Sequence, residues 1–392
     1  MTSNGDPVVV VGGARTAIGR FGGSLKDVDA YKLGAAAIVE ALSRSGVDPE
    51  QVDEVVMGQI GQVGPDAYNA RRCAIEAGIP VTSTAMTVNR LCSSGLQAIL
   101  SGAQEILTGQ ADVVVAGGDE SMSRQPFLDF GARDGYRLGS RTLVDGTMSM
   151  VTDPFGNYPM GYTGEMVAER YEVGREAQDR WAFESQQKAA AAIEAGRFDE
   201  QIVPIDVPRK EPFVRDEHPR ADTTLEGLGK LKAVFKEGGS ITAGNSAGIN
   251  DGGAAVVLMK QSEAERRGLE PRLVLRAWAV TGIAPEIMGY APAHAIPKAC
   301  EKAGITVDDL DVVELNEAFA AQVVAIVRDA GLDPEKVNPN GGAIALGHPV
   351  GATGAIMTVK LMHELERTDG RYGVVTMCIG GGQGMAAVFS RS

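Results

Sequence analysis

Short runs of β-branched residues alternate with alanine-rich segments of helical periodicity along most of the chain. Five short runs rich in β-branched apolar residues are predicted to be buried strands, at residues 8–11, 55–57, 113–116, 312–315 and 374–377. Four segments are predicted to be helices, at residues 33–43, 94–107, 318–329 and 352–365. This alternation predicts an α/β fold with helices on both faces of a mostly parallel sheet.

The chain also repeats itself once. Residues 52–56 are similar to residues 310–313, and residues 111–118 are similar to residues 371–376. The two offsets are 257 residues (312 − 55) and 261 residues (374 − 113). Offsets this similar indicate duplicated halves, the alternative being chance similarity between valine-rich strands.

A segment of different composition separates the halves. Prolines 204, 208, 212 and 219 exclude long helices around them, whereas residues 175–195 predict one long helix with Trp181 as its apolar anchor. We interpret this segment as an inserted loop domain, a kind of region that often shapes substrate pockets. The predicted divisions are residues 1–120 (completed by about 250–270), 121–249 and 271–392.

Composition excludes several classes of function. The formal charge of −14 argues against a nucleic-acid-binding surface, and no apolar run is long enough to predict a membrane span. Residues 1–7 lack the pattern of a signal peptide, so the predicted location is cytoplasmic. Four cysteines are too few for a disulfide scaffold and fit a reducing compartment.

Glycine is overrepresented, with 50 of 392 residues. This is about 13%, against roughly 7% in average proteins. The glycines form clusters such as 341–342 and 380–382. Clusters of this kind suit turns at which the backbone approaches a ligand or another backbone closely.

Cys92 lies between an extended apolar segment and the small-residue turn that opens the helix predicted at 94–107. The helix dipole favours the thiolate form of a thiol at this position, which makes Cys92 a candidate nucleophile. The alternative is a buried structural cysteine, the commoner role of a single cysteine.

His348 is one of four histidines and lies in a turn rich in glycine and proline, residues 338–354, that opens the next helix. Such a turn holds an imidazole stiffly, as a catalytic base requires. A structural histidine with satisfied ring nitrogens is the alternative.

Cys378 follows a predicted strand and precedes Gly380, Gly381 and Gly382, whose N–H groups could bind a developing oxyanion. A phosphate-binding loop is the alternative, but the Lys-Ser/Thr ending of a P-loop is missing. The cysteine and histidine spacings match no zinc pattern, so no metal is expected.

Asn316 follows the strand predicted at 312–315, at the carboxyl edge where open α/β sheets place their ligands. A plain helix cap is the alternative for this residue.

Five motifs, at residues 89–95, 118–123, 316–320, 347–351 and 378–384, together resemble the thiolase family, the acyl-CoA acetyltransferases. The similarity extends over essentially the whole chain. It implies two repeated α/β halves stacked in five layers, αβαβα, with an inserted loop domain, usually in a homodimer or homotetramer.

The reaction implied by the resemblance is thiolysis of a 3-oxoacyl-CoA by coenzyme A (CoA), or the reverse Claisen condensation. Cys92 would become acylated, His348 would take its proton, and Cys378 would be the second acid and base. Asn316, through a water, and His348 would form one oxyanion hole, and the N–H groups of Cys92 and Gly380 the other. CoA is a substrate here, and the chemistry needs no metal or redox cofactor.

The resemblance also implies that the loop domain binds CoA. The expected contacts are Arg220 at the nucleotide end, Phe235 and Ala243 along the pantetheine tunnel, and Met160, Ala318 and Phe319 near the acyl group. Ala247 replaces a serine that contacts CoA in many biosynthetic members. Residues 92–97 look more like the degradative branch, which favours β-oxidation of longer or bulkier substrates over a biosynthetic acetoacetyl-CoA thiolase.

Two other hypotheses remain. A decarboxylating condensing enzyme has this kind of fold but uses cysteine with two histidines or with histidine and asparagine, so Cys378 argues against it. A non-catalytic CoA-binding relative would have lost a reactive group, yet Cys92, Asn316, His348 and Cys378 are all present.

Overall fold

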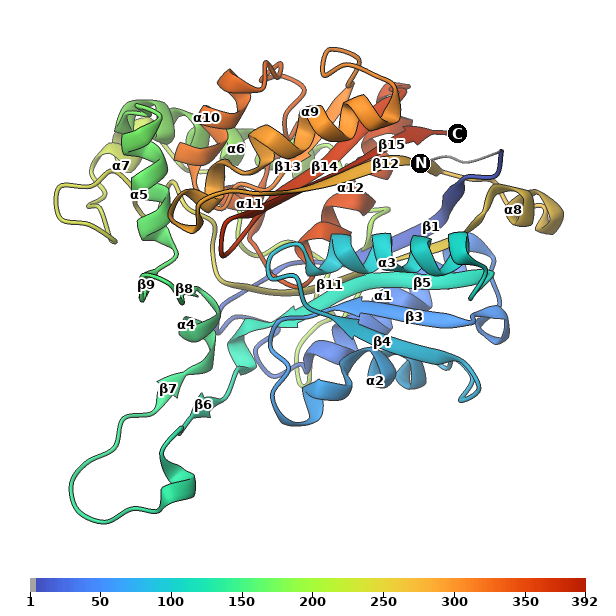
Figure 1. Cartoon of the computed structure of the whole chain (residues 1–392), viewed down its shortest axis with the longest axis horizontal. Coiled ribbons are helices and arrows are strands. Elements are labelled where there is room, and N and C mark those ends of the chain that lie inside the picture. The colour runs from blue at the N-terminus through green and yellow to red at the C-terminus, as the bar shows by residue number, and fades with distance from the viewer. Residues whose placement is uncertain (1–4) are drawn as a thin grey trace.

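The fold is built on one mixed sheet, to which each half of the chain contributes a block of neighbouring strands. The computed structural model describes residues 5–392. Residues 1–4, part of the segment 1–7 in which no signal peptide is predicted, lie outside the described residues. The N-terminal block contains β1 (Val8–Thr16), β3 (Glu54–Gly58), β4 (Thr84–Val88), β5 (Val113–Ser121) and β11 (Asn250–Lys260). The C-terminal block contains β12 (Leu273–Gly282), β13 (Val312–Leu315), β14 (Tyr372–Ile379) and β15 (Gln383–Arg391). The strand order is β13-β14-β15-β12-β1-β11-β5-β3-β4 (Figure 1).

The two blocks have the same topology, which confirms the duplicated halves. In the first block β3 is parallel to β5, and β5, β11 and β1 are antiparallel neighbours. In the second, β13 is parallel to β14, and β14, β15 and β12 are antiparallel neighbours. The equivalent pairs β3/β13 and β5/β14 are those that the sequence offsets align.

The prediction of a mostly parallel sheet is wrong, because each block contains antiparallel strands that the sequence pattern did not separate from their neighbours. The three-residue turn 380–382 joins β14 to β15, and so short a connection permits only antiparallel pairing.

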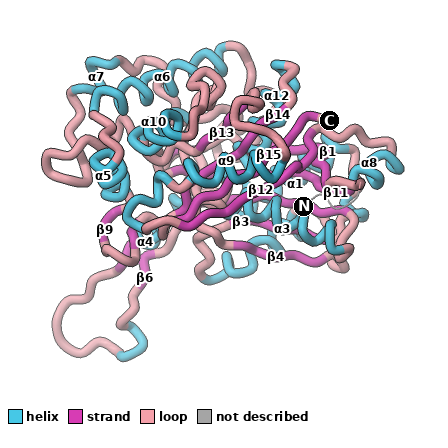
Figure 2. The backbone as a smooth tube through the Cα atoms, turned by 45° about the horizontal axis from the view of Figure 1, so that its top comes forward, coloured by secondary structure: helices cyan, strands magenta, loops and turns pink. Residues whose placement is uncertain are grey.

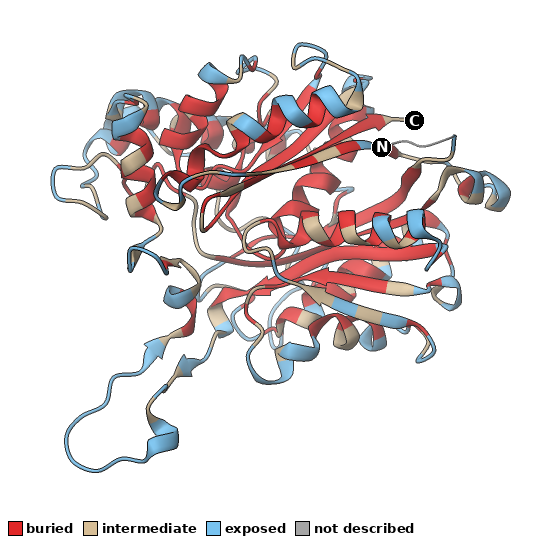
Figure 3. Ribbon diagram, viewed as in Figure 1, coloured by how far each residue is buried: buried red, intermediate tan, exposed pale blue. Residues whose placement is uncertain are grey.

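Helices complete five alternating layers, as expected (Figures 1 and 2). One outer layer contains α1 (Ala30–Ser45) and α2 (Asn69–Glu76), and the other contains α9 (Pro292–Ala303) and α10 (Ala320–Asp329). The central layer is formed by α3 (Ser94–Thr108) and α12 (Thr353–Thr368), one from each half, which pack against each other between the two blocks. Figure 3 shows most strands of the sheet as buried, the edge strand β4 as partly exposed, and α9 as exposed on its outer side. α10 begins two residues later than predicted, because Phe319 has an extended backbone.

Residues between β5 and β11 form the irregular region that the composition indicated. Its helices are α4 (Gly146–Met150), α5 (Gly161–Arg170), α6 (Arg175–Glu194) and α7 (Leu225–Gly229), of which α6 is the predicted long helix. Its strands are β6 (Phe127–Leu128), β7 (Val144–Asp145), β8 (Thr152–Asp153), β9 (Tyr158–Pro159) and β10 (Ile202–Val203). The segment from β6 to β7 is an arm that projects away from the body (Figure 1).

One strand and two α-helices remain, and all three are short: β2 (Gly19–Arg20), α8 (Gln261–Arg267) and α11 (Ala343–Leu346). Within residues 5–392, the helices are all too short or too polar to cross a membrane.

Glu317 ties α6 to the C-terminal half. Its buried carboxylate accepts hydrogen bonds from Trp181 Nε1 at 3.0 Å and Ser185 Oγ at 2.7 Å, both on α6. It also accepts from Asn338 Nδ2 at 2.8 Å and the Ile344 N–H at 3.1 Å. One carboxylate therefore satisfies four buried donors from separate segments.

We expect Glu317→Ala to lower the free energy of unfolding by about 3 kcal/mol or more, because it leaves buried donors without an acceptor. Urea denaturation measures this change. The control, Glu335→Ala, removes an exposed carboxylate and should stay within about 0.5 kcal/mol of the wild type. Equal stability of the two variants would contradict the anchoring role of Glu317.

Candidate active site

The four reactive or polar side chains selected from the sequence lie at one end of the central layer. Cys92 precedes α3, His348 precedes α12, Asn316 follows β13 and Cys378 belongs to β14. A methyl group on Gly380, two residues after Cys378, would lie 3.2 Å from Cδ1 of Leu91, the residue before Cys92. The pKa of Cys378 is raised first by burial and then by the charge of Cys92, in keeping with this proximity. The structure therefore brings together groups that lie up to 286 residues apart (378 − 92).

Cys92 stands on a strained turn. Leu91, directly before it, has a φ of 48°, a conformation that residues with a side chain rarely adopt. The turn is held by hydrogen bonds from the Leu91 N–H to Asn89 Oδ1 at 2.9 Å and from Ser94 Oγ to the Leu91 carbonyl at 2.6 Å. Strain that is over-determined in this way is typical of functional sites, because it presents a side chain that a relaxed turn would not.

The hydrogen bonds of His348 define its tautomer. Thr353 Oγ1 donates its single proton to the Pro349 carbonyl at 2.9 Å and lies 2.7 Å from His348 Nδ1. Nδ1 must therefore be the donor to Thr353, which leaves Nε2 with a free lone pair. Nε2 faces Asn316 Nδ2 at 3.4 Å, so Nε2 is an acceptor that can take a proton.

Gln322 connects Asn316 with Cys378, and the sequence reasoning missed it. Its Nε2 donates to the Asn316 carbonyl at 3.1 Å and to Cys378 Sγ at 3.3 Å. It lies one turn into α10 and carries no motif signal beyond a polar side chain within an apolar helix. Thr353 was missed as well, although its position five residues after His348 on α12 is a signal that could have been used.

A buried amide and a buried carboxylate brace the loops around the site. Asn250 Oδ1 accepts from the His348 N–H at 3.0 Å. Glu120 accepts from the N–H groups of Ile60, Gly61 and Gly351 at 2.9–3.1 Å, which ties the loop after β3 to the loop that carries His348. Glu120 belongs to one of the five motifs but had no role assigned.

Burial dominates the electrostatics of the site. It raises the pKa of Cys92 to about 11 and that of Cys378 to about 12, and it lowers the pKa of His348 to about 4. The expectation that the helix N-terminus favours a thiolate at Cys92 is wrong for the unliganded protein, because loss of hydration outweighs the dipole. At neutral pH the site contains two thiols and a neutral imidazole.

The backbone around Gly380 offers N–H groups to the sulfur of Cys92. Hydrogen bonds from the N–H groups of Gly380 and of Cys92 itself lower the pKa of the Cys92 thiol, although less than burial raises it. Gly381 and Gly382 have φ values of 82° and 85°, and they turn the chain so that the Gly380 N–H points inward.

Five residues expected to contact substrate lie close to one another or to Gly380, and Met160 is the one beside Gly380. A methyl group on Gly380 would approach Met160 Cε to 3.2 Å. The rings of Phe235 and Phe319 meet edge to face at a centroid distance of 6.3 Å. The Ala247 N–H donates to the Ala318 carbonyl at 3.0 Å, which joins the loop domain to the motif that contains Asn316.

The two other expected contacts lie further out. Ala243 is exposed on the turn before Asn245, and Arg220 is exposed at the surface, where its N–H donates to Gln186 Oε1 of α6 at 2.8 Å. Within residues 5–392, no hydrogen bond or ion pair links the side chain of Arg220 to the four central residues.

Comparison with known proteins agrees with this arrangement. The family model "Thiolase, N-terminal domain" matches residues 8–262, and "Thiolase, C-terminal domain" matches residues 269–391. The beta-ketothiolase BktB of Cupriavidus necator is 53% identical over 389 residues, 98% of this chain and 99% of the relative. An acetyl-CoA acetyltransferase of Chromobacterium violaceum is 48% identical over the same shares of the two chains.

Solved structures give the same result. The acetyl-CoA acetyltransferase of Bacillus anthracis superposes with a TM-score of 0.97 at 45% identity, covering 99% of both chains. Human mitochondrial 3-ketoacyl-CoA thiolase in complex with CoA superposes with a TM-score of 0.96 at 43% identity, covering 99% of this chain and 98% of that one.

Fold and comparisons together define an acyltransferase. The chain belongs to the thiolase family, whose reaction is the thiolytic cleavage of 3-oxoacyl-CoA or the reverse Claisen condensation.

The raised thiol pKa predicts how Cys92 reacts with iodoacetamide as a function of pH. With a pKa of about 11, the thiolate fraction is small at pH 7 and increases about tenfold per pH unit. Alkylation at Cys92, measured by mass spectrometry, should therefore increase up to about pH 9 without a plateau. A plateau near neutral pH would instead indicate a thiolate–imidazolium pair in the unliganded protein.

Proposed function

We propose that Cys92 carries the acyl group, that His348 takes the Cys92 proton, and that Cys378 is the second acid and base. The observation that carries this proposal is the grouping of three reactive side chains. The Gly380 N–H lies against the Cys92 thiol, the Cys378 thiol interacts with the charge of Cys92, and the imidazole of His348 has an acceptor Nε2 that faces Asn316 at 3.4 Å. Each group needed to break and remake a carbon–carbon bond beside a thioester is then present in one place.

In the direction of thiolysis, Cys92 Sγ attacks the 3-oxo carbon while its proton passes to His348 Nε2. The bond between C2 and C3 breaks, and the enolate of acetyl-CoA takes a proton from Cys378. CoA then gives its thiol proton to the Cys378 thiolate and attacks the acyl group on Cys92. The Cys92 thiolate leaves and recovers its proton from His348, so each group returns to its starting state.

The raised pKa of Cys378 suits this role. The α-carbon of a thioester is a very weak acid, so its proton is removed efficiently only by a strong base. A thiol with a pKa of about 12 gives a thiolate of that kind once it has lost its proton to the enolate.

Two oxyanions form during the cycle, and we propose two sets of donors for them. The N–H groups of Cys92 and Gly380 converge on the sulfur of Cys92, so they would lie close to the carbonyl oxygen of an acyl group bound to this sulfur. Asn316, through a water, and the Nε2–H of protonated His348 would stabilise the second. Their separation of 3.4 Å supports a shared target.

For the substrate, we propose 3-oxoacyl-CoA with acyl groups longer or bulkier than acetoacetyl, degraded in cytoplasmic β-oxidation. The apolar group of Met160, Phe235 and Phe319 supports an apolar acyl chain. Residues 121–249 would then be the CoA-binding loop domain, with Ala243 and Ala247 beside the pantetheine and Arg220 at the nucleotide. A biosynthetic acetoacetyl-CoA thiolase is the alternative, supported by relatives that carry the name acetyl-CoA acetyltransferase.

We expect Cys92→Ala to lower the rate of thiolysis by about 10³-fold or more without unfolding the protein, because the acyl acceptor is lost. Cys378→Ala should form acyl-Cys92 with acetyl-CoA, detectable by mass spectrometry, but should not complete condensation. Residual turnover near the wild-type rate in Cys92→Ala would refute the nucleophile assignment.

A chain-length series separates the two candidate substrates. We expect kcat/KM for thiolysis to be higher with six- or eight-carbon 3-oxoacyl-CoA than with acetoacetyl-CoA in steady-state assays. Activity restricted to acetoacetyl-CoA would favour the biosynthetic alternative.

We also propose a homotetramer in which the β6–β7 arm joins subunits. The arm exposes large apolar side chains that a monomer would leave in water, among them Phe127, Phe130, Tyr136, Leu138 and Leu143. Leu138 is fully exposed, at 101%.

Light scattering on the purified protein tests the role of this arm. The wild type should have the mass of a tetramer. The double variant Phe130→Ser with Leu138→Ser should have the mass of a smaller species. An unchanged mass of the variant would contradict the role of the arm.

A further inference from the structure

A buried ion pair lies directly behind Asn316. Lys360 Nζ donates to Glu314 Oε2 at 2.7 Å, and the two side chains are 3% and 1% exposed. Lys360 also donates to the Gly341 carbonyl at 2.9 Å. The desolvation of two buried charges offsets most of their attraction, so such a pair adds little to the stability of the fold. Its position behind Asn316 therefore indicates another role.

The pair connects the two elements that position the second oxyanion hole. Glu314 and Asn316 are two residues apart on and after β13, so their side chains share one face of the strand. Thr353 and Lys360 are seven residues apart on α12, so they share one face of the helix. The ion pair therefore clamps the strand that leads to Asn316 against the helix whose first residue holds His348.

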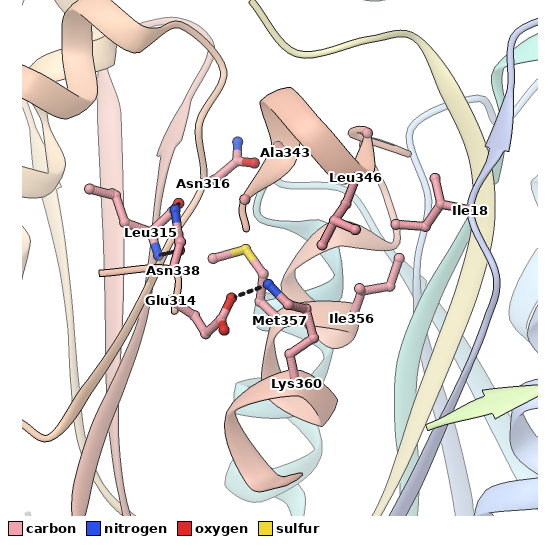
Figure 4. A pocket seen from close by; sticks show the side chains of 12 residues that line it. Ile18, Glu314, Leu315, Asn316, Asn338, Ala343, Leu346, Ile356, Met357 and Lys360 are labelled. Carbon is pink, nitrogen blue, oxygen red and sulfur yellow. Dashed lines mark hydrogen bonds and ion pairs between the residues drawn. The ribbon is translucent and has the colours of Figure 1, made fainter. Parts of the chain in front are cut away.

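A small cavity lies between these groups (Figure 4). Its volume is about 20 Å³, which suffices for one water molecule but not for two. All of its lining residues are buried, and the polar side chains among them include Glu314, Asn316 and Lys360. Figure 4 shows the amide of Asn316 at one side of the pocket and the ion pair at another.

The hydrogen-bonding capacity around the cavity matches one water. Within the part of the chain that the structure describes, Glu314 Oε1 and Asn316 Oδ1 are buried acceptors without a protein donor. Lys360 uses two of its three N–H groups, which leaves one donor. A water molecule can accept from one donor and donate to two acceptors, and three hydrogen bonds are the usual number for an internal water.

We propose that this cavity binds one internal water, which accepts from Lys360 and donates to Glu314 Oε1 and Asn316 Oδ1. Glu314 and Lys360 are then positioning residues. By engaging Oδ1 from behind, the water fixes the amide so that Nδ2 faces His348 Nε2 and the oxyanion. This inference rests on the proposed role of Asn316 in the second oxyanion hole, and the water is distinct from the one through which Asn316 would reach the substrate.

Two measurements test the proposal. A high-resolution crystal structure of the wild-type protein should show one water within hydrogen-bond distance of all three groups. The double variant Glu314→Gln with Lys360→Met removes both charges at similar volume. It should lower kcat roughly ten- to a hundredfold, because a misplaced catalytic group costs about this much, while KM for CoA stays within about twofold.

Controls separate positioning from stability. Met357→Leu changes an apolar residue of the same cavity and should keep kcat within about twofold of the wild type. If the double variant does not fold, Glu314→Gln alone, which is isosteric, should lower kcat in the same direction. Alkylation of Cys92 should be unchanged in each variant, because the pair does not contact the thiol.

A wild-type crystal structure without this water, or a folded double variant with wild-type kcat, would overturn the proposal. The variant Asn316→Ala separates a failure of the water proposal from a failure of the proposed function. Wild-type kcat in Asn316→Ala would refute the catalytic role of the amide, whereas the crystallographic water reports on the cavity independently of activity.

Discussion

The close approach of α3 and α12 is the constraint on which the site depends. A Cβ on Gly354 of α12 would lie 2.4 Å from the backbone nitrogen of Leu96, and a Cβ on Gly95 of α3 would lie 2.9 Å from that of Ala355. The two helix starts are therefore in backbone contact, and each glycine makes room for the other helix. Since Cys92 precedes one helix and His348 the other, this contact sets the distance between the thiol and the imidazole.

This constraint also explains why the reactive groups are neutral. Helices packed so closely between the two blocks of the sheet exclude water from their N-termini, and burial is the largest cause of the pKa shifts of Cys92, His348 and Cys378. Glu120 is buried next to the same loops, and its charge raises the pKa of Cys92 further. At neutral pH Cys92 is thus a thiol, and His348, before the neighbouring helix, has an Nε2 that can accept a proton.

Local sequence signals predicted the positions of the main strands and of the turns that carry the site. Apolar runs located strands, and glycine clusters located the turns beside Cys378 and His348, because these features depend on a few consecutive residues. Strand direction was not predictable in this way, since β5 and β11 pair across more than a hundred intervening residues. Gln322 escaped notice for a related reason. It is an ordinary helical residue in the sequence, and its function depends on Cys378, which only the fold brings within 3.3 Å.

The expectation of a thiolate at Cys92 was wrong because burial depends on the whole fold, which the local sequence does not show. A helix N-terminus is a local feature, and its effect on a thiol can be anticipated from the sequence. The loss of hydration at Cys92 depends on segments that only the fold brings around it, and it cannot be anticipated in this way. The same holds for α12. Its sequence shows an amphipathic helix with one lysine, whereas in the fold Thr353, Gly354 and Lys360 each perform a separate task for the site. Thr353 sets the tautomer of His348, Gly354 admits α3, and Lys360 faces the strand that leads to Asn316. A substitution on this buried helix can therefore alter the chemistry without any contact with substrate.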